Sequence, residues 1–147
     1  MEWKRDGLTI STDRSRLDRD AIHEFLRGSY WARGIPRELV DRAIDNSLCF
    51  GLYDGDRLVG FARAITDFTT FAYLSDVFVL ESHRGRGLGT WFMETVLSHP
   101  DLQNLRRWML ATADAHGLYQ KVGFTALSKP ERIMEKLLAN AYGAGPR

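Results

Sequence analysis

The first half of the chain alternates short β-prone runs with two amphipathic helical patterns. Residues 8–12 (Leu-Thr-Ile-Ser-Thr) predict a strand, and the acidic cluster at residues 18–20 offers a cap for a helix over residues 21–26. Pro36 opens a second helical pattern, because its fixed φ suits the first helical position and the apolar residues after it recur on one face. Residues 28–34 join the two helices as a loop with aromatic side chains between glycines.

Two apolar runs, at residues 48–53 and 57–65, flank the sequence Asp54-Gly55-Asp56. An Asp-Gly pair tolerates the positive φ angles that tight hairpin turns require. These residues therefore predict a β-hairpin.

The second half of the chain predicts the order strand, helix, strand. Residues 71–80 form a long β-prone run that leads directly into a basic, glycine-rich segment at residues 84–90. An amphipathic helix follows and ends at Ser98-His99-Pro100. Residues 108–111 then predict a strand parallel to the previous one, because a strand, helix, strand connection normally forms a right-handed crossover.

The last part of the chain predicts a short helix over residues 115–122, stopped by Gly123, and a returning strand over residues 124–127. Residues 131–138 fit either a strand or a helix, and their apolar spacing favours the helix. Residues 143–147 are expected to form a frayed tail.

Composition narrows the class of protein. A chain of 147 residues with 44% hydrophobic content suits one domain over residues 1–147. The 20 Lys and Arg residues balance the 19 Asp and Glu residues, so we expect neither nucleic acid nor a membrane surface as partner. The single cysteine, Cys49, excludes an intrachain disulfide, and the spacings of structural zinc sites are missing, so we expect no metal and a cytoplasmic location. The sequence has no transmembrane-length apolar stretch.

The candidate chemistry centres on the segment Arg84-Gly85-Arg86-Gly87-Leu88-Gly89-Thr90. Glycines placed where a strand leads into a helix let backbone N–H groups converge on an anion, and the two arginines add positive charge. The alternative is an ordinary exposed turn. A Walker loop is excluded because no Lys precedes Thr90, and a dinucleotide fingerprint is excluded because its third glycine would come one residue early.

The pattern Arg84-x-x-Gly87-x-Gly89 resembles the pyrophosphate motif of the GNAT superfamily of acyl-CoA-dependent N-acetyltransferases. Residues 117–124 (Gly-Leu-Tyr-Gln-Lys-Val-Gly-Phe) are similar to a second motif of that family, and the resemblance covers about residues 71–127. It implies an α+β fold with a mixed, mostly antiparallel central sheet. About six to seven strands would be flanked by about four helices, and the sheet would splay between two parallel strands.

The resemblance also implies how acetyl-CoA would bind. The backbone of Val77, Phe78 and Val79 would pair with the pantetheine arm, and the segment from Arg84 to Thr90 would hold the pyrophosphate. Thr112 stands where the family often has Asn, and is the candidate for a hydrogen bond that orients the coenzyme.

Tyr119 matches the family's general acid, which protonates the departing thiolate. A phenol with pKa near 10 and a thiol near 8.5 make this transfer uphill by roughly 2 kcal/mol in isolation. The alternative is that Tyr119 only packs the last helix onto the sheet.

Asp76 is the first candidate for the general base, because a carboxylate within an apolar strand is costly to bury without a task or a partner. A structural role remains open. Strand alternation places Asp76 on the same face as Leu74 and Phe78, so a bulge or the strand's edge would decide whether Asp76 meets the acceptor. Asp114 and His116 are further candidates for the base, as is a chain of water molecules.

The acceptor would lie beside an aromatic wall made by Tyr30, Trp31 and Phe68. Asp67, together with the carboxylates at positions 76 and 114, would favour a cationic amine. The acceptor itself, a small molecule or a protein, is unidentified, and a homodimer is among the assemblies we consider.

The sequence therefore predicts an N-acetyltransferase that moves an acetyl group from acetyl-CoA directly to a primary amine. One alternative is a noncatalytic acyl-CoA-binding or regulatory module. A nucleic-acid-binding domain built on Arg84, Arg86, Arg106 and Arg107 is a second alternative, which the balanced charge disfavours.

Overall fold

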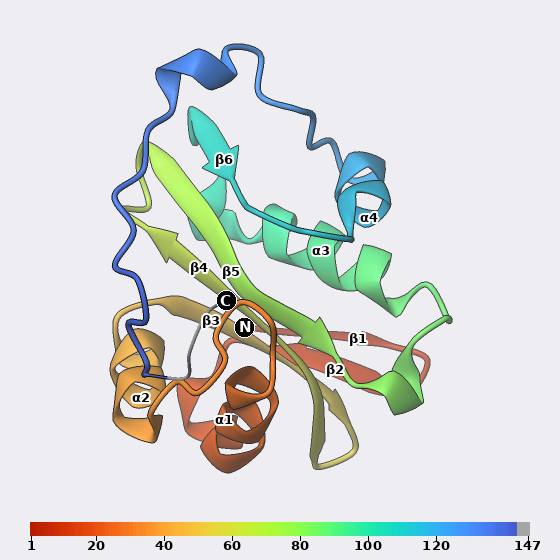
Figure 1. Cartoon of the computed structure of the whole chain (residues 1–147). Coiled ribbons are helices and arrows are strands. Elements are labelled where there is room, and N and C mark those ends of the chain that lie inside the picture. Colours follow the sequence, from red (N-terminus) through yellow and green to blue (C-terminus); the bar gives the residue numbers. More distant parts are fainter. Residues whose placement is uncertain (144–147) are drawn as a thin grey trace.

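The computed structural model describes residues 1–143 and contains one six-stranded sheet flanked by four α-helices (Figure 1). The strands are β1 Glu2–Arg5, β2 Leu8–Ser11, β3 Leu48–Asp54, β4 Arg57–Thr66, β5 Phe71–Val79 and β6 Arg107–Met109. The helices are α1 Arg19–Arg27, α2 Arg37–Asp45, α3 Leu88–Ser98 and α4 His116–Lys121. Single 3-10 turns occupy Arg14–Arg16, Glu81–His83, Pro100–Leu102 and Pro130–Arg132.

The strands lie in chain order, and each of the first four pairs antiparallel with the next. Only β5 and β6 are parallel, and they pair over residues 71–73 and 107–109 alone. Beyond that short ladder the two strands diverge. The predicted mixed sheet, with a splay between two parallel strands, is thus confirmed.

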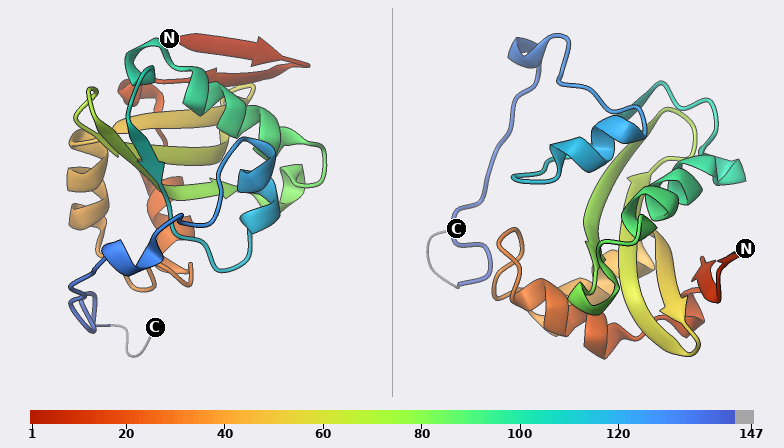
Figure 2. Two further views of the ribbon diagram at one scale, coloured as in Figure 1. Left: turned by 90° about the horizontal axis from the view of Figure 1, so that it is seen from above. Right: turned by 90° about the vertical axis from the view of Figure 1, so that its right-hand side faces the viewer.

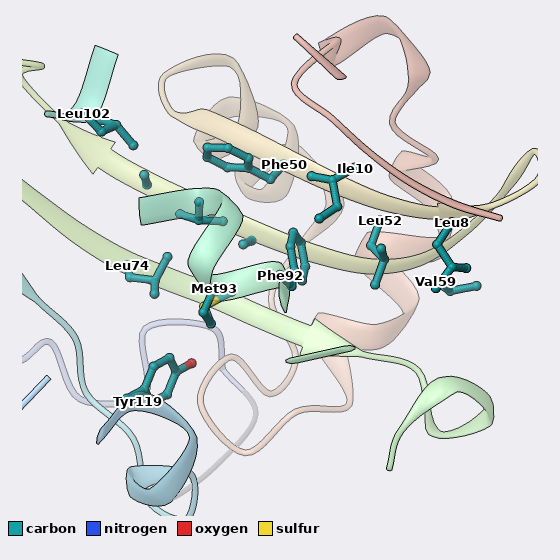
Figure 3. Close-up of a cluster of buried hydrophobic side chains, with 13 residues drawn as sticks. Leu8, Ile10, Phe50, Leu52, Val59, Leu74, Phe92, Met93, Leu102 and Tyr119 are labelled. Carbon is teal, nitrogen blue, oxygen red and sulfur yellow. The ribbon is translucent and has the colours of Figure 1, made fainter. Parts of the chain in front are cut away.

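Two hydrophobic cores lie on opposite faces of the sheet. Helices α1 and α2 cover one face, with Ile22, Leu26, Val40 and Ile44 almost fully buried. Helix α3 covers the other face (Figures 1 and 3), and its buried side chains Phe92, Met93 and Val96 pack against β-strand residues. Each such side chain contributes roughly 1.5–3 kcal/mol through burial, which fixes both helix layers on the sheet.

Local signals explain most element boundaries. The Asp18 carboxylate accepts a hydrogen bond from the backbone N–H of Ala21 at 3.0 Å and caps α1, as predicted. Gly55 in the β3–β4 turn adopts φ 61°, which an Asp-Gly turn needs. The sequence prediction missed β1, although Asp6 and Gly7 both have positive φ and close a hairpin onto β2.

Two predictions for the carboxyl-terminal part are wrong. Residues 124–127 form no strand. In the segment 131–138, Glu131 and Arg132 complete the 3-10 turn at Pro130–Arg132, and residues 133–138 are neither strand nor helix. All residues from 125 to 141 are exposed and none of them pairs with a strand within residues 1–143, so neither pairing nor burial imposes regular structure on them. Of the predicted tail, residues 144–147 lie outside the described residues.

No helix within residues 1–143 is both long enough and apolar enough to cross a membrane.

Candidate active site

A cleft of about 1020 Å³ opens where β5 and β6 separate. One wall is the end of β5 together with the glycine-rich turn that follows it. The opposite wall is α4 with the residues just before it, and the α1–α2 loop closes one end. The described residues of β6 pair only with Phe71–Tyr73, so the backbone of Val77–Val79 faces this cleft without a strand partner on that side.

The glycine-rich turn has the backbone shape of an anion site. Gly85 and Gly87 adopt φ 83° and 71°, and α3 begins at the next residue, Leu88. No side chain caps the first turn of α3, which leaves its N–H groups available to a ligand. A Cβ built on either glycine would meet no atom within 4 Å, so there is open space above both. The turn therefore offers donors, a helix N-terminus and room for a phosphate.

Not all residues of the glycine-rich turn border the cleft. Arg84, Gly85, Gly87, Leu88 and Gly89 line the cleft, whereas Arg86 and Thr90 do not. The guanidinium of Arg84 is held at the site, because its Nε donates to the Val79 carbonyl at 2.8 Å.

Gly89 lies against α4. A Cβ there would lie 3.5 Å from the side chain of Leu118, which is ordinary van der Waals contact, so packing does not by itself require glycine at this position.

The Tyr119 phenol lies at the centre of the site. Its ring extends from α4 toward Leu74 and Met93 (Figure 3) and packs edge-on against Phe124 at 5.9 Å between ring centroids. The side chain is 8% exposed and lines both the cleft and two adjoining pockets, while its hydroxyl has no hydrogen-bond partner within residues 1–143. Burial, helped by Tyr30 and Asp114, raises the pKa of Tyr119 to about 12.

Asp76 is not free to act as a base. Its Oδ1 accepts from Trp31 Nε1 at 2.9 Å, and its Oδ2 accepts from Arg63 Nε at 2.9 Å. The Arg63 and Asp76 side chains are 14% and 10% exposed, which makes this a largely buried ion pair. These contacts favour the structural alternative considered for Asp76.

The bulge considered for the strand at Asp76 is present. Asp76 adopts φ 57°, and the β4–β5 register shifts between Phe61 and Arg63, which marks a β-bulge. The extra residue moves Phe78 to the α1 face, where it stacks on Phe25 with ring centroids 3.9 Å apart, while Leu74 stays in the core under α3.

A second pocket of about 500 Å³ adjoins the cleft at Tyr119. Its walls come from the α1–α2 loop, the β5 bulge and the segment after β6, and include Tyr30, Trp31, Tyr73, Asp76, Asp114 and Tyr119. The Tyr30 hydroxyl accepts from the Ala113 N–H at 3.0 Å, so the loop is tied across the pocket. Asp114 is exposed, lines both the pocket and the cleft, and forms no ion pair within residues 1–143.

Three residues predicted to contribute to the site do not have the predicted position or contacts. Phe68 is 49% exposed in the β4–β5 turn and lines neither the cleft nor the second pocket, so the predicted aromatic wall lacks it. The Asp67 carboxylate accepts hydrogen bonds within that same turn, chiefly from Thr70, which hold its pKa well below its usual range. The Thr112 hydroxyl accepts from the Ala115 N–H at 3.0 Å and lines the second pocket rather than the cleft.

The sequence prediction missed two residues that line the site. Tyr73 faces the second pocket, and the buried His83 lines the cleft beside Arg84. His83 Nε2 lies 2.9 Å from Asp54 Oδ2, and this contact connects the residues just before the glycine-rich turn to the β3–β4 hairpin. The sequence carries no local signal for this contact, because 29 residues separate the two side chains.

Among residues 1–143, no group of three or more His, Cys, Asp or Glu side chains is arranged to hold a metal ion. The only cysteine, Cys49, is buried, and burial raises the pKa of its thiol to about 12, so it is not a nucleophile for this site.

Comparisons with known proteins agree with this geometry. The sequence profile described as "Acetyltransferase (GNAT) family" matches residues 19–124. A Gibberella zeae protein assigned as an acetyltransferase is 34% identical, over 82% of this chain and 80% of its own length. A crystal structure from Xanthomonas campestris, of a protein assigned to the GNAT family, is 51% identical with a TM-score of 0.90 and covers 95% of this chain and 99% of that one.

A GNAT family acetyltransferase from Elizabethkingia anophelis, solved with acetyl-CoA bound, has a TM-score of 0.63 at 16% identity. The alignment covers 92% of this chain and 91% of that one, and at this identity the likeness concerns the fold.

Proposed function

The chain belongs to the GNAT family of acetyltransferases, and on that premise we propose that it transfers an acetyl group from acetyl-CoA directly to a primary amine. The observation that carries the proposal is the position of Tyr119. Its unpartnered phenol lies where the cleft meets the second pocket, so one proton donor faces both a donor and an acceptor site.

The cleft fits acetyl-CoA part by part. The α3 N-terminus and the open space at Gly85 and Gly87 suit the pyrophosphate, and Arg84 adds positive charge. On the cleft side, Val77 and Phe78 have no strand partner and suit the amides of pantetheine, which would add to β5 like a further strand. The Val79 carbonyl already accepts from Arg84 Nε. Acetyl-CoA bound to the Elizabethkingia anophelis relative supports this assignment for the shared fold.

The second pocket suits a compact cationic amine. Asp76 is neutralised by Arg63, which leaves Asp114 as the carboxylate without an ion-pair partner among the described residues that line this pocket. The faces of Tyr30, Trp31 and Tyr73 add favourable cation–π surface. The acceptor would therefore arrive as an ammonium ion drawn by Asp114 and lose its proton to solvent at the exposed rim.

Transfer then needs attack, cleavage and protonation. The neutral amine nitrogen forms a bond to the thioester carbonyl carbon, the C–S bond breaks, and the departing sulfur receives the Tyr119 proton. The new amide nitrogen gives up one proton to solvent, and the tyrosinate takes one back from solvent, which restores the phenol. With the phenol pKa at about 12 and a thiol near 8.5, complete transfer from Tyr119 is uphill by about 5 kcal/mol. The phenol would therefore act as a strong hydrogen-bond donor as the negative charge develops on sulfur, with protonation completed as the bond breaks.

The proposal is tested by incubating the enzyme with acetyl-CoA and a panel of primary amines while free thiol is measured. We expect acetyl-CoA to raise the melting temperature, and thiol release to depend on a primary amine. The matched control is the N,N-dimethyl analogue of the best amine, which has no N–H to lose.

The two halves of the proposal fail separately. An unchanged melting temperature at high acetyl-CoA would remove the donor site. Stabilisation by acetyl-CoA without amine-dependent thiol release would keep the donor site and reject the amine acceptor. Asp114→Asn should raise the KM for a cationic amine about tenfold and leave acetyl-CoA affinity unchanged.

A further inference from the structure

The connection from β5 to α3, residues 80–87, lies beside the β3–β4 hairpin at one end of the sheet (Figures 1 and 2). It first forms the 3-10 turn Glu81–His83 and then the glycine-rich turn. Within the described part of the chain, Gly85 and Arg86 form no backbone hydrogen bond. The position of the glycine-rich turn therefore depends on the contacts that hold the residues on either side of it.

His83 links this connection to the hairpin. Its side chain is buried, Nε2 lies 2.9 Å from Asp54 Oδ2, and Nδ1 lies 2.7 Å from Ser82 Oγ. Among residues 1–143, no other side-chain hydrogen bond joins the connection to a distant part of the chain. A backbone hydrogen bond from the Leu80 N–H to the Val59 carbonyl, at 2.8 Å, is also long-range but lies farther along the chain from the glycines.

The His83 ring lines the cleft but has no nitrogen left for a ligand. One nitrogen contacts a carboxylate and the other a hydroxyl, so neither can also donate to a phosphate oxygen. Gly85, with its positive φ, follows only two residues later. The ring therefore acts on a ligand through the backbone of the turn whose start it holds.

A glycine-rich turn needs such support if its amides are to converge before the ligand arrives. Glycine loses more conformational freedom on ordering than any other residue, and ordering that happens during binding weakens the affinity. No side chain caps the first turn of α3, so the order of the turn comes from the contacts at its flanks. The buried contact between His83 and Asp54 supplies one of them.

We propose that His83, through its contact with Asp54, is a positioning residue for the donor, and that it holds the glycine-rich turn in the conformation that binds the pyrophosphate of coenzyme A. The inference rests on the proposed function, because the pyrophosphate is the group that this turn would hold. It gives the β3–β4 hairpin, which does not line the cleft, a part in donor binding. The role concerns only donors that carry a pyrophosphate, which distinguishes it from a general contribution to stability.

The first experiment compares two donors on the intact chain. These are acetyl-CoA and S-acetylpantetheine, which has the same thioester and pantetheine arm but no pyrophosphate. His83→Ala should lower kcat/KM for acetyl-CoA about tenfold, through KM rather than kcat, because the loosened turn must then be ordered during binding. With S-acetylpantetheine, kcat/KM should stay within about twofold of the parent value, because this donor does not use the turn.

Further variants connect the effect to the contact itself. His83→Gln, whose amide can donate to Asp54 and accept from Ser82, should recover most of the activity with acetyl-CoA. Asp54→Ala should reproduce the loss, and combining it with His83→Ala should change kcat/KM by less than about twofold more, because the two side chains form one contact. Asp56→Ala, at an exposed position of the same hairpin turn, is the control and should match the parent. If His83→Ala does not fold, Asp54→Ala carries the comparison of donors, because the Asp54 side chain is 55% exposed.

Titration calorimetry with coenzyme A and with pantetheine separates failure of this inference from failure of the proposed function. It needs no turnover, so an incorrect amine acceptor does not affect it. A parent protein that does not bind coenzyme A would overturn the donor site and this inference together. The inference alone is overturned if the parent binds coenzyme A and both His83→Ala and Asp54→Ala bind it with unchanged affinity. It is equally overturned if these variants lose activity with both donors to the same extent.

Discussion

The donor half and the acceptor half of this site are built from different parts of the chain. The donor half is mainly backbone: the open edge of β5, two glycines with positive φ, and the first turn of α3. The acceptor half is mainly side chains brought together from distant segments, such as Tyr30 with Ala113 and Trp31 with Asp76. Binding at the donor half should therefore depend on backbone conformation. The shape of the acceptor half should depend on hydrogen bonds between residues that are distant in sequence.

This difference matches what each half has to recognise. The pyrophosphate and pantetheine amides of coenzyme A can be recognised by backbone groups without a particular side chain. Acceptors differ between enzymes, and their selection requires side chains of particular charge and shape. Tyr119 lies between the two halves, and the predictions below test whether the division is real.

The largest expected effect is on the catalytic rate and comes from changing Tyr119, which lies between the two halves. Tyr119→Phe should lower kcat about 100- to 1,000-fold, because the departing sulfur loses its proton donor, while acetyl-CoA affinity changes less than threefold. Thiol release at saturating substrates gives kcat, and thermal shift gives the affinity. Tyr73→Phe, which also lies in the acceptor half, is the control. A loss of kcat under fivefold in Tyr119→Phe would remove this residue from the chemistry.

The next effect concerns the acceptor half. Asp76→Ala should lower the free energy of unfolding by about 3 kcal/mol, because it leaves the Arg63 guanidinium largely buried without its partner. Urea unfolding monitored by tryptophan fluorescence measures the loss. The exposed ion pair between Glu24 and Arg27 supplies the control, and Glu24→Ala should leave the unfolding midpoint almost unchanged. If Asp76→Ala is as stable as the parent, the pair does not organise the pocket.

A smaller effect is expected in the donor half. Gly87→Ala should weaken acetyl-CoA binding about tenfold, because a side chain disfavours φ 71° by about 1 kcal/mol and a relaxed turn would misdirect its amides. Gly7→Ala imposes the same kind of strain at φ 81° in the β1–β2 turn and should cost stability without changing affinity. Equal affinities in both variants would show that the turn at Gly87 does not bind the donor.

The smallest effect expected is with pH. Because burial raises the pKa of Tyr119 to about 12, the phenol keeps its proton through the range in which an amine acceptor is deprotonated. A raised pKa is also a stability term that is fully present below pH 10 and is lost as pH rises from 10 to about 12. The rate at saturating substrates should therefore show no decline between pH 8 and 10. A decline in that interval, absent from Tyr119→Phe, would contradict the raised pKa.

Much of the fold and of the donor half was predictable, because their signals are local. The Asp54-Gly55 turn, the Asp18 cap and the glycines at 85 and 87 each answer a backbone requirement within a few residues. The wrong predictions concern the segment 124–138, where apolar residues alone were read as regular structure. Regular structure there needs pairing or burial, and within residues 1–143 the residues from 125 to 141 are all exposed and pair with no strand.

The sequence by itself determined the strand and helix order between residues 8 and 122, the glycine-rich turn and the tyrosine 30 residues after Gly89. Only the tertiary structure decided what Asp76 does, because its partners Trp31 and Arg63 lie 45 and 13 residues away along the chain. The bulge at Asp76 reversed the facing of Phe78 for the same reason. A turn or a helix start is fixed by the φ angles its own residues allow, whereas the state of a carboxylate is fixed by whichever charges the fold brings near it.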